Sequence, residues 1–264
     1  MYIAGQRPVY PKETTGKGWA AMAKAGYRKK IARGSAWQSI EMEIEEKKET
    51  GRKMAVSVFG AKEIIEGFED SSFQVTARCA IDILTAKLKI ADAELFLELG
   101  RNVLVHTDGR LKSAESILSK CRKKGYAPTY ENVQEKLNDL IGVRAVCSFE
   151  DDVYRMAEVL KTHKDLRIIK KKDYIKVPKS SGYRSLHLIV EIPVYFQEER
   201  KWVRAELQLR TPAMDFWAGV DHQLRYKKGK QEAVLIGEEL KEYSQVIAEL
   251  DKKMVELRGR IEAM

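Results

Sequence analysis

Residues 202–211 read Trp-Val-Arg-Ala-Glu-Leu-Gln-Leu-Arg-Thr, and apolar and polar side chains alternate along them with a period of two. This alternation predicts a β-strand, because successive side chains of an extended chain point to opposite faces of a sheet. The apolar face carries Val203, Ala205, Leu207 and Leu209, and the polar face carries Arg204, Glu206, Gln208 and Arg210. We expect the apolar face to lie in a core, whereas a polar strand face is most often exposed to solvent.

Further strands and helices are predicted on both sides of this strand. Short β-branched or apolar runs predict strands at residues 143–147, 166–175 and 184–194. Apolar residues at steps of three and four predict helices at residues 73–99, 112–124, 132–140, 151–163, 212–226 and 235–261. Helices around a central group of strands indicate an α+β (α/β-like) fold, with a mixed β-sheet of about five strands flanked by helices.

The net charge of +9 is concentrated near the N-terminus. Residues 1–36 hold eight of the 48 basic side chains and only one of the 39 acidic ones, so the remainder is close to neutral. A basic segment indicates an anionic partner, and RNA contact is one possibility. Gly and Pro interrupt residues 1–18, while 19–31 and 41–53 have the spacing of short helices. We expect a basic extension, flexible or partly helical.

The composition excludes several classes of protein. With 44% hydrophobic residues the chain is not disordered throughout. Its three cysteines, Cys79, Cys121 and Cys147, have no metal-binding spacing, and so sparse a set fits a reducing compartment. No run of 18 apolar residues predicts a membrane-spanning helix, and the N-terminus lacks the apolar region of a secretory signal. We therefore expect a cytoplasmic protein without membrane contact.

Two carboxylates on neighbouring strands are candidates for a metal site. Asp139 comes just before the predicted strand 143–147, and Glu206 lies on the polar face of the strand 202–209. Mg²⁺ is commonly held by one or two carboxylates together with substrate phosphates. Many proteins contain such a pair, so this observation alone is weak.

Residues 172–187 combine cations, aromatic rings and a histidine. Lys172 and Lys179 flank a loop of Pro, Ser and Gly, and on the following strand Tyr183, Ser185 and His187 are expected to share one face. Lysines supply positive charge for phosphates, and an aromatic face can stack on a nucleobase. A lysine-rich surface hairpin accounts for the same residues equally well.

A third cluster lies on the predicted helix 112–124. Lys112, Ser116 and Lys120 are spaced at i, i+4 and i+8, so they form one stripe, and Arg110 precedes them. Two ammonium groups, a hydroxyl and the amides of a helix N-terminus suit a polyphosphate. Taken alone, a solvated basic helix face is the commoner reading. The Gly-x-x-x-x-Gly-Lys-Ser/Thr loop of P-loop NTPases is absent from the sequence.

Five motifs in this order resemble the RelA/SpoT-type alarmone synthetase domain, most of all the stand-alone small alarmone synthetases. They are Gly109-Arg-Leu-Lys112 with Ser116, Asp139-Leu-Ile-Gly-Val-Arg144, Lys172-Asp-Tyr-Ile175 with Gly182-Tyr-Arg-Ser-Leu-His187, Glu206-Leu-Gln-Leu-Arg-Thr211 and Ala213-Met-Asp-Phe-Trp217. The resemblance spans residues 73–260. It implies a nucleotidyltransferase-like mixed sheet and transfer of pyrophosphate from ATP to the 3′-hydroxyl of GDP or GTP, giving AMP and (p)ppGpp for the stringent response.

The resemblance also implies a role for each candidate residue. The catalytic and Mg²⁺-binding residues would be Asp139 and Glu206, with Glu206 also accepting the proton of the attacking hydroxyl. The ATP site would comprise Arg110 and Arg144, which sandwich the adenine, and Lys112, Ser116 and Lys120, which hold the phosphates. The GDP or GTP site would comprise Tyr183, which stacks on guanine, together with Lys172, Lys179, His187 and Gln208.

The expected organisation is an N-terminal extension at 1–60, a catalytic domain at 61–230 and a C-terminal helix at 231–264. The family resemblance implies that terminal helices assemble a homotetramer, although the apolar stripe of the last helix could equally pack on its own domain. Two other functions stay open. One is a toxin-type relative that pyrophosphorylates the 3′ end of tRNA, and the other is a catalytically silent RNA-binding module.

Overall fold

The computed structural model describes residues 53–196, 199–225 and 230–264. By its internal contacts the chain divides into two units, Met1–Gly51 and Arg52–Met264, and the elements described here belong to the second. Residues 1–52 of the extension expected at 1–60 fall outside the described residues, and so does the helix expected at 41–53 except for Lys53. Residues 53–60 belong to a helix that begins at Lys53. Within these ranges no helix is long and apolar enough to cross a bilayer.

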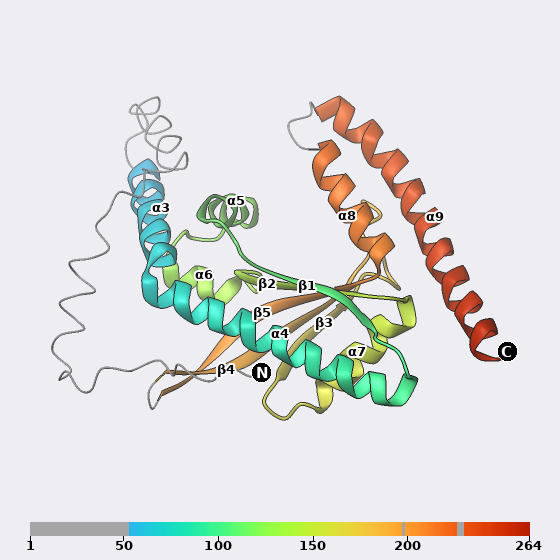
Figure 1. Ribbon diagram of the computed structural model, residues 1–264. Coiled ribbons are helices and arrows are strands. Elements are labelled where there is room, and N and C mark those ends of the chain that lie inside the picture. The colour runs from blue at the N-terminus through green and yellow to red at the C-terminus, as the bar shows by residue number, and fades with distance from the viewer. Residues whose placement is uncertain (1–52, 197–198, 226–229) are drawn as a thin grey trace, which may run out of the picture. The chain divides into compact units, whose positions relative to one another are not determined.

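In the described residues a five-stranded mixed sheet forms the centre of the second unit, as the sequence predicted (Figure 1). Its strands are β1 (Leu104–Leu111), β2 (Ile141–Cys147), β3 (Arg167–Asp173), β4 (Leu186–Phe196) and β5 (Glu199–Arg210). Their order across the sheet is β1-β2-β5-β4-β3. The pair β2–β5 is parallel and the other pairs are antiparallel. The last strand in the sequence therefore lies in the middle of the sheet.

The two faces of the sheet differ in character. Ala205, Leu207 and Leu209 of β5 are fully buried against α4 (Ser71–Leu99) and α7 (Glu150–Thr162), which confirms the face predicted from the alternation. In Figure 1, α4 runs along this side of the sheet. The opposite face presents Glu206 and Gln208. Because α4 and α7 pack on the apolar face, the side chains of the polar face can contact a ligand.

The helices at the β1–β2 connection begin and end differently from the sequence expectation. The helix α5 spans Ala114–Lys124 with Ser113 as its N-cap, so Lys112 precedes it rather than opening it. The backbone N–H of Lys112 donates to the carbonyl of Leu140 (2.9 Å), which keeps Lys112 in the extended chain. The helix α6 spans Tyr130–Lys136 and does not continue to Leu140. The preceding helix, α3, spans Lys53–Glu69 and packs against α4, α5 and α6.

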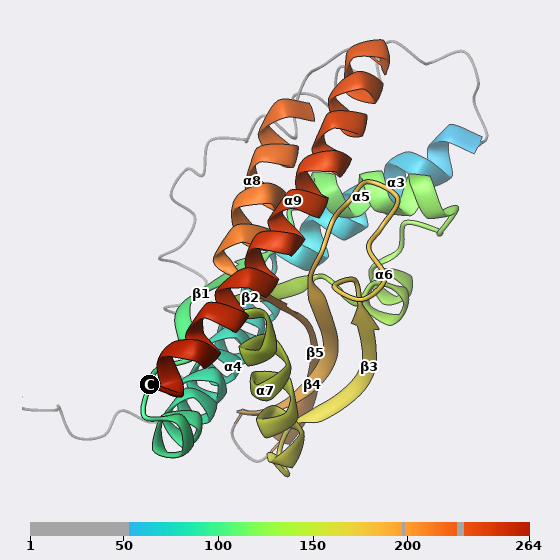
Figure 2. The ribbon, with the colours of Figure 1, turned by 90° about the vertical axis from the view of Figure 1, so that its right-hand side faces the viewer.

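The helices α8 (Pro212–Arg225) and α9 (Lys230–Glu262) pack side by side (Figures 1 and 2). The indole N–H of Trp217 in α8 donates to the carbonyl of Leu240 in α9 (2.7 Å). Near its C-terminal end, α9 is joined to α7 by Arg258, whose guanidinium donates to both carboxylate oxygens of Asp151 (3.0 and 2.7 Å). The C-terminal helix is therefore tied to its own unit at Leu240, in its first half, and at Arg258, near its C-terminal end.

Candidate functional site

Asp139 lies between two lysine side chains at the entry to β2. Its Oδ2 accepts a hydrogen bond from Lys112 Nζ (3.0 Å), and its Oδ1 forms an ion pair with Lys120 Nζ (2.7 Å). Burial acts to raise the pKa of this carboxyl, but the hydrogen bonds and charges of Lys120 and Lys112 together outweigh it, so the pKa is lowered. Asp139 is therefore ionised at neutral pH and holds both lysines in place.

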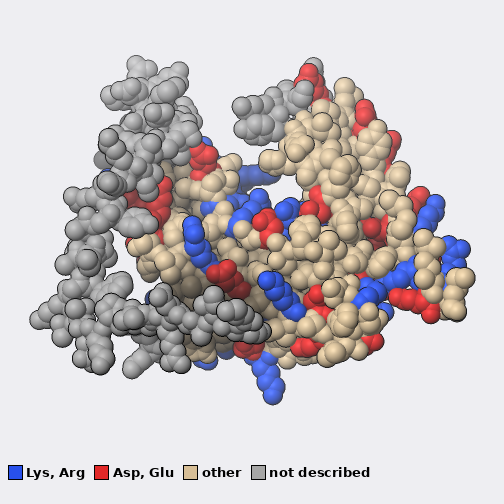
Figure 3. Space-filling model, in the orientation of Figure 1, with Lys and Arg blue, Asp and Glu red and all other residues tan. Residues whose placement is uncertain are grey.

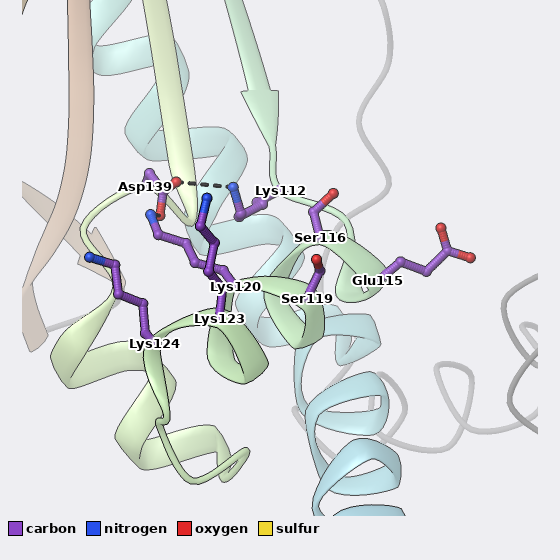
Figure 4. Close-up of a pocket in the computed structure, with 8 residues that line it drawn as sticks. All are labelled: Lys112, Glu115, Ser116, Ser119, Lys120, Lys123, Lys124 and Asp139. Atoms are coloured by element: carbon purple, nitrogen blue, oxygen red, sulfur yellow. Dashed lines mark hydrogen bonds and ion pairs between the residues drawn. The ribbon is translucent and has the colours of Figure 1, made fainter. Parts of the chain in front are cut away.

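These residues line a cavity of about 680 Å³, which we call the lysine pocket (Figure 4). Its lining residues are Lys112, Glu115, Ser116, Ser119, Lys120, Lys123, Lys124 and Asp139. The predicted Lys112, Ser116 and Lys120 do meet here, although only the last two are on α5. Figure 4 shows Lys123 and Lys124 beside them, whereas Glu115 points away. Four ammonium groups around one cavity suit a polyanion such as a chain of phosphates.

Glu206 lies at the middle of the sheet, on the polar face of β5. Its Oε1 accepts a hydrogen bond from Gln208 Nε2 (2.8 Å) and lies 3.4 Å from Nδ1 of His187. Burial acts to raise the pKa of Glu206, but His187 and Gln208 lower it by more, so the net shift is downward despite the nearby charge of Asp139. An ionised carboxylate at this position can accept a proton at neutral pH.

On the side of β4, a chain of hydrogen bonds supports Glu206. His187 is 5% exposed, and its Nε2 lies 2.8 Å from the hydroxyl of Tyr183, which accepts a hydrogen bond from Arg210 Nη2 (2.8 Å). If His187 carries its proton on Nδ1, it donates to Glu206 and accepts from Tyr183. Burial raises the pKa of Tyr183, and this keeps its hydroxyl protonated and able to donate.

Aromatic and cationic groups of the β3–β4 loop gather around this chain. The ammonium of Lys179 lies 4.5 Å from the centre of the Tyr183 ring and 4.6 Å from that of Tyr174. Desolvation against these rings lowers the pKa of Lys179, the charge of Glu206 opposes this, and Lys172 and other cations add to it. Lys172 is paired with His187 across β3 and β4. The predicted Lys172, Lys179, Tyr183 and His187 are thus brought together.

Ser185 lies beside Tyr183, as the sequence predicted, and just before the start of β4 at Leu186. Its side chain is fully buried and donates to the carbonyl of Leu209 (3.1 Å). A side-chain hydrogen bond between Ser185 and Tyr183 acts to lower the pKa of the tyrosine, although burial raises it overall.

Arg110 and Arg144 lie on the strands next to the lysine pocket. Arg110 is paired with Gly142 and Asp108 with Arg144 across β1 and β2, so the two arginines are diagonal neighbours on one sheet face. Diagonal neighbours are about 7–8 Å apart. The backbone therefore directs both side chains to the same region of this sheet face. Arg144 donates to Asp108 Oδ2 (3.0 Å) and Asp215 Oδ1 (3.1 Å).

Asp215 joins the two halves of the site and was not singled out from the sequence. Its Oδ1 accepts from Arg144 Nη1 (3.1 Å) and from Arg210 Nη1 (2.9 Å), while Arg210 Nη2 reaches Gln208 Oε1 (2.7 Å) as well as Tyr183. Asp215 lies within the motif 213–217 and Arg210 lies on the polar strand face, so the sequence patterns included both residues without giving them a role. Their link depends on where α8 packs, which periodicity does not reveal.

Basic and acidic side chains lie together on one region of the surface. In Figure 3, Lys and Arg side chains gather together with carboxylates between the positions that α5 and α8 occupy in Figure 1. No group of three or more His, Cys, Asp or Glu side chains in the described ranges could hold a metal ion. A metal at this site would therefore depend on two carboxylates and on oxygen atoms of a ligand.

Comparison with known proteins identifies the family to which such a site belongs. The model of the region found in RelA / SpoT proteins matches residues 109–231. The GTP pyrophosphokinase YwaC of Bacillus subtilis (strain 168) is 44% identical over 183 residues, which cover 69% of this chain and 87% of that protein. The chain belongs to the RelA/SpoT family. Within that family, the GTP pyrophosphokinase YjbM of the same organism is 36% identical over 190 residues, covering 72% of this chain and 89% of YjbM.

Solved structures of RelA/SpoT relatives have the same fold. The small alarmone synthetase 2 from Bacillus subtilis aligns with a TM-score of 0.61 and 42% identity, covering 70% of this chain and 97% of that one. The small alarmone synthetase 1 from the same organism, bound to its product pppGpp, aligns with a TM-score of 0.64 and 34% identity, covering 72% and 97%. The fold and the RelA/SpoT family predicted from the five motifs are confirmed.

Proposed function

We propose that this chain transfers pyrophosphate from ATP to the 3′-hydroxyl of GDP or GTP and releases AMP and (p)ppGpp. The observation that carries the proposal is the position of Glu206. It lies on the central strand β5, between β2, beside which the lysine pocket opens, and β4, which carries His187. Its lowered pKa keeps it ionised at neutral pH, which is the form that can accept a proton. The names of YwaC and YjbM as GTP pyrophosphokinases support the same reaction.

The two nucleotides are assigned to opposite sides of Glu206. ATP would place its phosphates in the lysine pocket and its adenine between Arg110 and Arg144. GDP or GTP would stack its base on Tyr183 and reach Lys172, Lys179, His187 and Gln208 with its polar groups. Transfer of a phosphoryl-type group depends mainly on positioning and charge neutralisation, which lysines and arginines supply.

Asp139 and Glu206 are the residues proposed to hold Mg²⁺. The negative charge of Asp139 acts to raise the pKa of Glu206, so the two carboxylates repel each other, and a cation held by both would relieve this repulsion. The contacts of Glu206 with Gln208 and His187 both fall on Oε1, so a cation that binds Oε2 displaces neither. Mg²⁺ held by Asp139 and Glu206 would neutralise charge on the ATP phosphates. Lys112 and Lys120, which contact Asp139, would then turn toward those phosphates.

Replacement of Glu206 by Gln tests the proposal. The variant keeps the shape of the side chain but removes the proton acceptor, so we expect synthesis to fall by at least 10³-fold while the melting temperature stays near that of the wild type. Glu199→Gln is the matched control, because Glu199 lies on the same strand and its side chain is 79% exposed. Near-normal turnover by Glu206→Gln would refute the assignment.

The acceptor is identified by a labelling experiment. Incubation with ATP labelled in its β-phosphate and with GDP, GTP or deacylated tRNA transfers the label to the true acceptor. We expect labelled guanosine polyphosphate and unlabelled tRNA. Label on tRNA would support the toxin-type reaction, and label on neither acceptor would support a catalytically silent module. The same reactions run with and without Mg²⁺ test the need for the metal.

The proposed oligomeric state rests on the helix α9, and the proposed cellular location rests on the cysteines. Along α9 the side chains of Tyr243, Val246, Leu250, Met254, Leu257 and Ile261 are exposed at helical spacing. Such a stripe on a helix suits association with further copies of the chain, and we expect a homotetramer, which light scattering would detect. Three free cysteines fit a cytoplasmic location. Contact with RNA through the N-terminal extension, residues 1–60, remains part of the proposal.

A further inference from the structure

The loop between β3 and β4, residues 174–185, carries two of the proposed acceptor groups on one tight turn. The N–H of Gly182 donates to the carbonyl of Lys179 (2.8 Å), and the N–H of Lys179 donates to the carbonyl of Tyr183 (3.2 Å). The positions of the Lys179 ammonium and the Tyr183 ring therefore depend on where this turn is held.

The turn is held by one side chain of α9. Ser244 is 2% exposed, and its hydroxyl donates a short hydrogen bond to the carbonyl of Gly182. The same oxygen accepts from Nε of Arg184 (3.3 Å), and Nη1 of Arg184 donates to the carbonyl of Ile175 at the start of the loop (2.9 Å). A single buried hydroxyl thus joins the tip of the loop to its base.

The close approach of loop and helix requires glycine at position 182. Gly182 has φ of +90°, a conformation that side-chain-bearing residues rarely adopt. A Cβ on Gly182 would lie 3.0 Å from both Cα of Lys241 and Cβ of Ser244. The backbone of α9 therefore fixes how deep the turn sits.

We propose that Ser244 is a positioning residue for the acceptor nucleotide, acting through the carbonyl of Gly182 on Tyr183 and Lys179. This inference rests on the proposed function. It assigns to the C-terminal helix a part in substrate binding, in addition to any part in assembly. The ATP side of the site has no such dependence, because its lysines stand on α5 and at the end of β1.

Steady-state kinetics of Ser244→Ala in the full chain test the proposal. We expect the KM for GDP to rise about tenfold, with the KM for ATP within twofold and kcat within threefold of the wild type. A tenfold change corresponds to about 1.4 kcal/mol. A purely structural role would lower the melting temperature or the active fraction without separating the two KM values. Gln245→Ala, an exposed neighbour on α9, is the matched control and should leave both KM values unchanged.

Gly182→Ala tests the same contact from the side of the loop, and it decides the question if Ser244→Ala does not fold. Its expected signature is again a raised KM for GDP alone. Gly259→Ala is its control, because a Cβ there meets no atom within 4 Å. If the wild type makes no guanosine polyphosphate, the proposed function fails. If the wild type is active and both variants keep the KM for GDP within twofold, the positioning role of Ser244 is refuted.

Discussion

Replacement of Asp215 by Asn perturbs both halves of the site through one atom. Oδ1 of Asp215 accepts from Arg144 and from Arg210, and asparagine keeps the shape of the side chain but removes its charge. The side chain of Arg210 is 9% exposed and that of Arg144 is 35% exposed, so solvent screens the two ion pairs unequally. We therefore expect the variant to change the KM values for GDP and ATP by different factors.

The magnitudes follow from this difference in exposure. Removal of one partner of a buried ion pair costs about 3–5 kcal/mol, whereas exposed pairs contribute about 0–1 kcal/mol. Asp215 is itself 19% exposed, and asparagine still offers an oxygen. We therefore expect a loss of about 1.4 kcal/mol on the side of Arg210 and about 0.7 kcal/mol on that of Arg144. These losses correspond to an approximately tenfold rise in the KM for GDP and a threefold rise in that for ATP.

The assay measures initial rates with labelled ATP while each nucleotide is varied in turn. Asp108→Asn is the matched control, because Asp108 contacts Arg144 and its side chain is 56% exposed. This control should change the KM for ATP slightly and leave that for GDP unchanged. If Asp215→Asn leaves both KM values within twofold of the wild type, or raises that for ATP more, the reasoning from Asp215 is wrong.

Two further predictions concern stability. The pKa values of Asp139 and Glu206 are lowered in the native state, so both ionised carboxylates stabilise the fold at neutral pH. This stabilisation is lost as the pH falls from the ordinary carboxyl range through the lowered pKa values. In urea unfolding between pH 7 and pH 3, the free energy of unfolding should therefore fall less in Asp139→Asn than in the wild type. Arg258→Ala removes the two hydrogen bonds to Asp151 and should lower the free energy of unfolding by about 2 kcal/mol, or the melting temperature by about 4–8 °C. Calorimetry measures this drop, and an equal drop in the more exposed Arg155→Ala would contradict it.

Much of the fold could be predicted because its elements have clear periods. The alternation along β5 and the apolar steps of α4 correspond to faces that are buried. The end of α4 also followed from the sequence, since Gly100 closes the helix with φ of +68°. These patterns lie within single segments, so they can be interpreted without knowing which other segments pack against them.

Two elements differ from the prediction because their sequence patterns do not match the structure they form: the strand β1 was not predicted, and the helix α6 was predicted to extend too far. The strand β1, Leu104–Leu111, is an edge strand whose side chains are mostly exposed, so it carries no apolar alternation. The residues Val133, Leu137 and Leu140 are spaced four and three apart and imitate a helix, but Leu137 is the extended C-cap of α6. All three are buried, because the irregular segment after α6 buries Leu137 and Leu140 without forming a helix.

The sequence named candidate residues for the site but not the contacts that connect them. The resemblance to a family supplied most of the cations and carboxylates, and the structure brings them together. The bridge made by Asp215 and the buried hydroxyl of Ser244 come from elements distant in sequence. Such contacts are set by tertiary packing, about which a pattern within one segment carries no information.

The central position of β5 has a consequence for the order in which the protein forms. β5 is the last strand to be synthesised, and it inserts between β2 and β4, which each have an unpaired edge until it arrives. Pairing across such a sequence separation is slow, and open edges invite aggregation during the interval. Because Glu206, Gln208 and Arg210 all lie on this strand, a nascent chain that ends before β5 lacks the central carboxylate and part of the proposed acceptor site. The site is therefore completed only after the last strand of the sheet and the helices that follow it have been synthesised.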